Sequence, residues 1–218
     1  MGAYRAQKGQ GQPKLIAIIG GSGSGKTFLA QMLHQALGRK AARLALDDFY
    51  RDRSGCHPAR RARINFDHPR AIDWAELETV LKNLAAGRAA LAPRYDFSTH
   101  TRRPVRRRVR PRPLVLVEGL WPCHKKSVRQ LFDFLIFLDC PEKTRLQRRL
   151  DRDVAERGRS PQSVRKQFYQ TVAPMHVRFV KPQKHWSDLV IRRPISGPEI
   201  ARLAQTITKL EQTKKETV

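Results

Sequence analysis

A glycine-rich segment near the amino terminus constrains this chain more than any other feature. Its residues are Gly20, Gly21, Ser22, Gly23, Ser24, Gly25, Lys26 and Thr27. They fit the pattern G-x-x-x-x-G-K-[S/T], between an apolar run, Leu15–Ile19, and a segment with helical spacing. Glycines allow positive φ, so backbone N–H groups can surround phosphate oxygens at the start of the helix. We expect Gly20–Thr27 to hold nucleotide phosphates, with Lys26 on the β- and γ-phosphates and the Thr27 hydroxyl on Mg²⁺.

Short apolar runs separated by helical patterns predict an α/β fold. The expected strands are Leu15–Ile19, Arg43–Leu46, Leu114–Val117, Phe134–Leu138 and Leu189–Ile191. The expected helices are Thr27–Leu37, Ile72–Ala86, Glu142–Arg157, Gln162–Val180 with a break near Pro174, and Pro198–Leu210. Leu91–Arg112 lacks a helical period and predicts short strands or a hairpin. Together these elements predict a P-loop NTPase fold, with a five-stranded parallel sheet and helices on both faces.

The composition narrows the classes of protein. The chain of 218 residues carries 44 Lys and Arg against 19 Asp and Glu, a net charge of +25, which favours polyanionic or phosphate-bearing partners. Apolar runs are too short to span a bilayer, and no signal peptide is evident. The three scattered cysteines predict neither a disulfide framework nor a zinc site. We therefore expect a cytoplasmic protein without membrane association.

Two predicted strands end in acidic residues, Asp47 and Glu118. In open α/β sheets the ligand crevice lies at the carboxyl ends of the strands, beside the phosphate loop. Asp47 could orient an acceptor proton, and either acid could help to hold Mg²⁺. The alternative is that both acids only form turns after their strands.

Arginines follow a helical spacing in the predicted helix Glu142–Arg157. Arg145, Arg149 and Arg152 share one face, and Arg157 and Arg159 follow where the helix should end. One interpretation is a lid of about 149–165 that neutralises the transferring phosphoryl group. The equally supported alternative is a solvated helix with ordinary ion pairs, such as Arg149 with Asp153.

These elements, in this order, resemble the uridine kinase family, in the wider group that includes phosphoribulokinase. The resemblance spans Leu15 to Pro194. Its most specific segments are Asn65-Phe66-Asp67-His68-Pro69 and Tyr95-Asp96-Phe97-Ser98-Thr99-His100-Thr101-Arg102. Further matches are the phosphate loop, Asp47-Asp48-Phe49-Tyr50, Leu116-Val117-Glu118-Gly119 and the arginine segment up to Arg159.

The resemblance implies a role for each matching residue. Asp47 matches the catalytic acid of the family and Asp67 an acid that holds the ribose diol. The pyrimidine pocket is matched by Tyr95, Phe97 and His100, and further substrate contacts by Tyr50, Arg149, Arg157 and Gln167. The implied catalytic set is Asp47, Lys26, Arg152 and Arg159, and the implied metal-organising set is Thr27, Glu118 and Asp47.

The implied activity is transfer of the γ-phosphate of ATP or GTP, with Mg²⁺, to the 5′-hydroxyl of uridine or cytidine. A single kinase domain would span 15–212, with a substrate lobe at about 51–112, a flexible leader at 1–14 and a tail at 213–218. The family also suggests a homotetramer. Two alternatives remain: a related kinase of ribulose phosphate, pantothenate or another sugar alcohol, and a nucleic-acid-binding NTPase.

Two segments depart from the family pattern. Residues 102–112 contain seven arginines and no acid, where mixed charge is usual, and Arg192-Arg193-Pro194 replaces the usual Pro-Arg-Gly near the adenine site. The arginine segment either binds a further ligand or forms a solvated basic surface, and the second interpretation is favoured.

Overall fold

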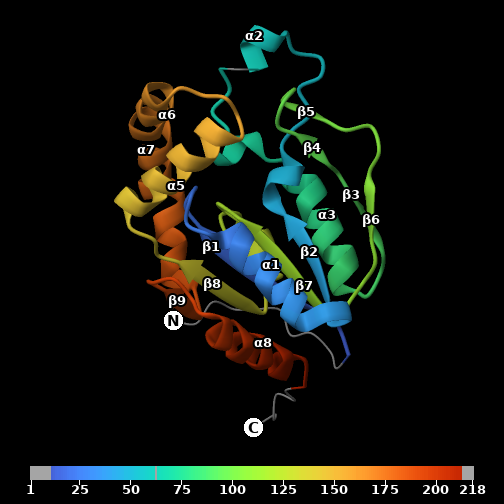
Figure 1. Ribbon diagram of the computed structural model, residues 1–218. Coiled ribbons are helices and arrows are strands. Elements are labelled where there is room, and N and C mark those ends of the chain that lie inside the picture. Colours follow the sequence, from blue (N-terminus) through green and yellow to red (C-terminus); the bar gives the residue numbers. More distant parts are fainter. Residues whose placement is uncertain (1–10, 62, 213–218) are drawn as a thin grey trace.

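A five-stranded parallel sheet organises the molecule (Figure 1). The computed structural model describes residues 11–61 and 63–212, so the tail and most of the predicted leader lie outside the described residues. The strand order is β2-β7-β1-β8-β9. The bounds are β1 Lys14–Gly20, β2 Ala41–Ala45, β7 Leu114–Gly119, β8 Phe134–Leu138 and β9 Leu189–Ile191. All five predicted strands are therefore present: β8 and β9 have the predicted bounds, and the ends of the others differ by at most two residues.

Strand β1 shows why the sheet is covered on both faces. Leu15, Ala17 and Ile19 pack into one apolar cluster, whereas Ile16 and Ile18 pack into another. Successive side chains of a strand point to opposite faces, so an uninterrupted apolar run needs cover on each side. Helix α3 lies on the first face, and α1 and α8 lie on the second (Figure 1).

The predicted helices are also present. Their bounds are α1 Lys26–Leu37, α3 Trp74–Ala85, α5 Glu142–Ala155, α6 Pro161–Gln167, α7 Ala173–Met175 and α8 Gly197–Gln212, with short α2 Pro58–Arg61 and α4 Lys126–Arg129. Asp73 caps α3, because its carboxylate accepts a hydrogen bond from the Glu76 N–H at 3.2 Å. Phe28 in α1 and Val154 in α5 are apolar, but their side chains are exposed.

The segment from 161 to 186 differs from its prediction. We expected a break near Pro174, but the chain stays helical there and changes its hydrogen bonding instead. Wider π-helical turns span Phe168–Val172 and His176–Val180, on either side of α7. Proline has no N–H to donate and its ring crowds the preceding turn, and the wider turns accommodate it without ending the helix.

The predicted hairpin region forms two small antiparallel sheets. Strands β3 Ala90–Ala92 and β6 Arg107–Val109 pair with each other, as do β4 Tyr95–Asp96 and β5 Thr101–Arg102. The arginine-rich segment is partly neutralised here. Arg102 and Arg106 contact Glu76 of α3 at 2.5 and 2.7 Å. These ion pairs hold the lobe against α3, so part of the arginine excess has a structural role.

No helix in the described ranges is both long and apolar enough to cross a membrane.

Candidate active site

The phosphate loop connects the end of β1 to the start of α1. Gly23 and Gly25 have φ of +79° and +94°, which side-chain-bearing residues rarely adopt. A Cβ at Gly23 would lie 2.4 Å from the Arg145 carbonyl oxygen, and one at Gly21 would lie 2.7 Å from Nδ1 of His176. The loop is therefore a tight cradle that only glycine fits. This geometry suits the binding of nucleotide phosphates predicted from the sequence.

Thr27 and Glu118, which the sequence predicts to organise a metal, are in direct contact. The Thr27 hydroxyl donates to Oε1 of Glu118 at 3.0 Å. Burial raises the pKa of the Glu118 carboxyl, and Lys26 opposes that rise by attraction. Among residues 11–61 and 63–212, no cluster of three or more His, Cys, Asp or Glu could hold a metal alone. This donor set fits Mg²⁺, which commonly takes few protein ligands and completes its shell with phosphates and water.

Asp47 lies at the carboxyl end of β2, in the single turn Leu46–Phe49. Strand β2 pairs with β7 so that Ala45 lies opposite Glu118, which brings both predicted acids to the same edge of the sheet. Burial raises the pKa of Asp47, while the charges of Lys26 and Arg152 lower it. Its Oδ1 atom is buried without a hydrogen-bond partner among the described residues. That oxygen is available to accept a proton from a bound hydroxyl.

Aromatic side chains form a cluster beside Asp47. The ring of Tyr50 contacts those of Phe66 and Tyr95 with centroids 5.1 Å apart in each case. The His100 ring stacks on Phe66 at 4.8 Å, with an interplanar angle of 16°. Phe97 contacts Tyr95 at 5.4 Å, yet its side chain is half-exposed at the rim. The residues predicted to hold a base thus form one aromatic cluster, which Phe66 joins.

Polar atoms of this aromatic cluster lack hydrogen-bond partners within the described part of the chain. They include the Tyr95 hydroxyl and Nδ1 of His100, both buried. Burial and the nearby charges of Arg157 and Arg61 lower the pKa of His100, so the imidazole is neutral near pH 7. A neutral imidazole offers one donor and one acceptor, as hydrogen bonding to the edge of a base requires.

Asp67 lies beside the phosphate loop. Ser22 and His176 line the same small cavity. Burial raises the pKa of the Asp67 carboxyl, and Arg149 opposes that rise. Repulsion from the Asp47 carboxylate also raises the pKa of Asp67, so the two acids lie close enough to interact. A carboxylate at this place can accept hydrogen bonds from two neighbouring hydroxyls.

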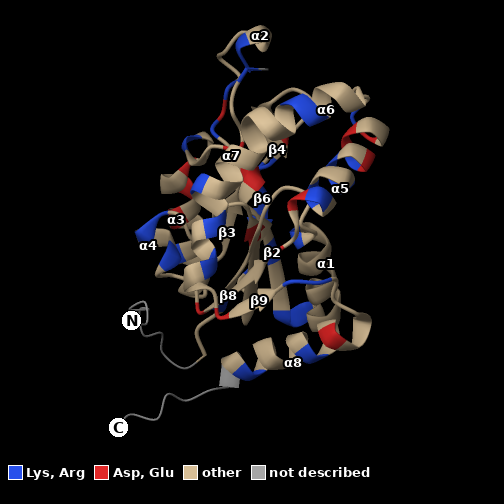
Figure 2. Ribbon diagram, turned by 90° about the vertical axis from the view of Figure 1, so that its left-hand side faces the viewer, with Lys and Arg blue, Asp and Glu red and all other residues tan. Residues whose placement is uncertain are grey.

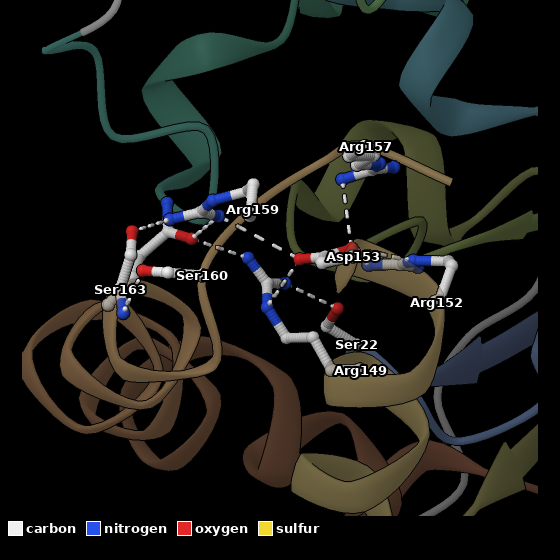
Figure 3. Close-up of polar contacts among 9 residues, drawn as sticks. Ser22, Arg149, Arg152, Asp153, Arg157, Arg159, Ser160 and Ser163 are labelled. Carbon is white, nitrogen blue, oxygen red and sulfur yellow. Dashed lines mark hydrogen bonds and ion pairs between the residues drawn. The ribbon is translucent and has the colours of Figure 1, made fainter. Parts of the chain in front are cut away.

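The predicted lid arginines converge on one carboxylate (Figure 3). Asp153 is fully buried, and its oxygens lie 3.4 Å from Nε of Arg149, 2.8 Å from Arg152, 3.4 Å from Arg157 and 3.8 Å from Arg159. The ion pair expected from spacing is therefore present, and it involves four arginines instead of one. One carboxylate cannot neutralise four guanidinium groups, so the cluster keeps an excess of positive charge beside the phosphate loop.

Gln167 and Ser22 tie this cluster to the rest of the site. Oε1 of Gln167 accepts hydrogen bonds from Arg149 at 2.8 Å and from Arg159 at 2.5 Å. Arg149 also donates to the hydroxyl of Ser22, in the phosphate loop, at 2.8 Å. These hydrogen bonds hold Arg149 and Arg159 near the phosphate loop, where guanidinium groups can contact phosphate oxygens.

Sequence reasoning missed three contributors. Phe66 stands inside the specific segment around Asp67, but nothing local shows that its ring stacks on His100. The spacing predicts Asp153 as a partner of Arg149 but not of the other three arginines. Arg148 donates to the Ser24 carbonyl oxygen at 3.3 Å, and its alternation with the other arginines of α5 gave no signal of that contact.

Comparison with known proteins gives one coherent result. Residues 15–196 match the model of the phosphoribulokinase/uridine kinase family. The uridine kinase of Chloroflexus aggregans is 42% identical over 192 residues, covering 86% of this chain and 92% of that protein. The uridine kinase of Ligilactobacillus salivarius is 35% identical, covering 92% and 94%. The phosphoribulokinase of Rhodobacter spheroides has the same fold, with a TM-score of 0.64 at 18% identity over 87% of this chain and 74% of that one.

Proposed function

The chain belongs to the phosphoribulokinase/uridine kinase family, and we propose that it is a uridine kinase that phosphorylates the 5′-hydroxyl of uridine or cytidine. The observation that carries this proposal is the position of Asp47. Its unpartnered Oδ1 lies in the same buried region as Lys26 of the phosphate loop and Tyr50 of the aromatic pocket. A carboxylate in that place can direct a hydroxyl at a terminal phosphate.

The donor would be ATP, or GTP, bound with Mg²⁺, which supplies the transferable phosphoryl group and balances its charge. Gly20–Thr27 would hold the phosphates through backbone N–H groups, and Thr27 with Glu118 would hold the metal. Arg152 and Arg159 would face the phosphate oxygens from the lid. Asp47 would orient the attacking hydroxyl and receive its proton.

The acceptor would be held by the pocket around His100. Asp67 would accept the 2′- and 3′-hydroxyls of the ribose, and Tyr95, Phe97 and Phe66 would pack the base. Tyr50, Arg149, Arg157 and Gln167 would complete the substrate contacts. We also propose, from the family alone, that the protein assembles as a homotetramer, which light scattering can test.

A coupled ADP-release assay over a panel of acceptors tests the proposal. Uridine and cytidine should give turnover, whereas ribulose 5-phosphate, pantothenate and shikimate should not. His100→Ala should lower kcat/KM for uridine by about 10-fold or more, as loss of one buried hydrogen bond and a ring contact predicts. Asp47→Asn should lower kcat for every acceptor by about 10²–10⁴-fold.

The outcomes separate the alternatives. Turnover with a sugar phosphate but with neither nucleoside would assign the chain to another activity of the same fold. ATP hydrolysis that rises with RNA and ignores nucleosides would favour a nucleic-acid-dependent NTPase.

A further inference from the structure

A second basic pocket lies outside the candidate active site. It is an open depression of about 680 Å³, lined by four arginines: Arg51, Arg53, Arg70 and Arg178. No acidic side chain lines it. It shares no lining residue with the phosphate loop Gly20–Thr27, so it is a separate cavity.

These arginines lack the ion pairs that neutralise others in the molecule. Arg102 and Arg106 are paired with Glu76, but none of the four pocket arginines has an acidic partner among the described residues. The side chain of Arg51 donates to the carbonyl oxygen of Arg70, at 3.3 Å, and to no acidic group among the described residues. Like charges held together in a concave surface create a positive potential, which a bound anion relieves.

The pKa of His68 reflects the same positive electrostatic potential. Its side chain lines the pocket, and its pKa is lowered by burial first and then by the charges of Arg70 and Arg178. No acid counters those charges at this point. The pocket therefore attracts anions more strongly than a surface with mixed charge would.

The remaining wall of the pocket is aromatic. Phe179 lies between His68 and His124, with ring centroids 4.8 and 5.6 Å away, and Trp74 lies 5.8 Å from His124. The indole N–H of Trp74 donates to the Pro69 carbonyl oxygen at 2.9 Å, which fixes the ring. Aromatic faces beside guanidinium groups match a ligand with both a planar base and phosphates.

We propose that this pocket is a second nucleotide-binding site, which takes one free mononucleotide with its phosphates on the arginines and its base on the aromatic wall. Its volume lies within the range of small-molecule sites in proteins. His68 directly follows Asp67 of the candidate acceptor pocket, so a ligand here would contact the same short segment. The proposal does not depend on which acceptor the kinase uses.

Equilibrium dialysis with radiolabelled ATP, in the absence of any acceptor, tests this proposal. The wild-type chain should bind two ATP molecules, and the double variant Arg70→Ala/Arg178→Ala should bind one. Lys26→Ala, which weakens the phosphate loop, should still bind one. A single ATP per wild-type chain, or two per chain in the double arginine variant, would overturn the proposal.

Matched control variants distinguish binding in this pocket from nonspecific attraction of ATP to a positively charged protein. Arg110→Ala/Arg112→Ala removes the same charge from exposed positions outside the pocket and should leave two ATP molecules bound. In the Lys26→Ala background, ATP should quench tryptophan fluorescence, and Trp74→Phe should remove that response. If a single-stranded oligouridylate occupies the pocket while ATP fails to compete with it, the pocket serves RNA and the proposal is wrong.

Discussion

Asp153 shows how much a single buried residue can organise. Its side chain is fully buried, and four arginines from the end of α5 and the following loop surround it. Without nucleotide, this carboxylate is the counter-charge that holds like-charged side chains together. Because the arginines outnumber it, they keep the capacity to contact phosphate oxygens as well. The residue thus positions the lid and does not itself need to touch a substrate.

Replacement of Asp153 by Asn should disturb this arrangement. The amide keeps the shape but removes the charge, so the guanidinium groups repel one another and lose their common anchor. We expect kcat/KM for ATP to fall by about 10–100-fold, as the loss of one or two charged hydrogen bonds predicts. The free energy of unfolding should fall by about 3 kcal/mol, since a partner of buried charges is removed. Steady-state kinetics and urea unfolding measure the two effects.

Asp151 supplies the matched control on the same helix. It is exposed, and its carboxylate accepts a hydrogen bond only from Gln147, at 2.8 Å. Asp151→Asn should change neither quantity by a measurable amount. Equal activity of Asp153→Asn and Asp151→Asn would show that the buried carboxylate does not position the arginines.

At the scale of elements, the phosphate loop is held between β1 and α5. Gly23 lies under the Arg145 carbonyl oxygen, and Gly25 precedes the first turn of α1. Strand β1 therefore fixes where the loop begins, and contact with α5 restricts the conformation of its backbone. This double restraint keeps the backbone N–H groups directed at one place before any ligand arrives.

Gly23→Ala should damage this loop in two ways. A left-handed φ costs a side-chain-bearing residue about 1–2 kcal/mol, and the new methyl group would overlap the Arg145 carbonyl oxygen at 2.4 Å. We expect KM for ATP to rise by about 10-fold or more. Gly55→Ala is the control, because Gly55 has neither a positive φ nor any atom near the added methyl group. An unchanged KM in Gly23→Ala would contradict the tight cradle.

Helices α3 and α4 are joined by a second acidic anchor. Glu78 contacts Lys125 at 2.8 Å, Ser127 at 2.8 Å and Lys82 at 2.9 Å. These contacts lower the pKa of Glu78 from 4.5 to about 2. A lowered carboxyl pKa stabilises the folded state above the unfolded pKa, and that stabilisation disappears as the pH falls through the folded pKa.

Glu78→Gln should therefore destabilise the fold in a pH-dependent way. Above pH 4.5 the variant should lose about 1 kcal/mol, the scale of a largely surface ion-pair network. The difference from wild type should shrink between pH 4.5 and pH 2. Chemical unfolding over this range measures it, with Glu142→Gln, at an exposed position, as the control. A pH-independent difference would assign the effect to packing.

At the scale of the whole molecule, the net charge of +25 is distributed and not gathered in one place. Figure 2 shows Lys and Arg on α4, α5 and α8 as well as on the β3–β6 region. Some of the arginines pair with Glu76 of α3, others surround Asp153, and others line the separate pocket. A distributed charge attracts polyanions without selecting a sequence.

We expect weak and nonspecific RNA binding as a consequence. Fluorescence anisotropy with a labelled single strand should show binding at low salt that falls by about 10³-fold or more between 50 and 200 mM salt. RNA should not stimulate ATP hydrolysis. Binding that resists salt, or hydrolysis that rises with RNA, would point instead to a dedicated nucleic-acid surface.

The sequence determined the framework of this protein. The phosphate loop, the five apolar strands and the acids at strand ends are local patterns, and a parallel sheet brings strand ends to one edge whatever the details of packing. Asp47, Glu118 and Thr27 therefore meet where the sequence predicts.

Only the tertiary structure decided which side chains from distant segments touch. The stacking of Phe66 on His100, the gathering of four arginines on Asp153 and the union of Arg51, Arg70 and Arg178 around one pocket all join residues that share no local pattern. Such contacts depend on how loops and helices pack on the sheet. They are set by burial and charge balance in three dimensions, which no spacing along the chain records.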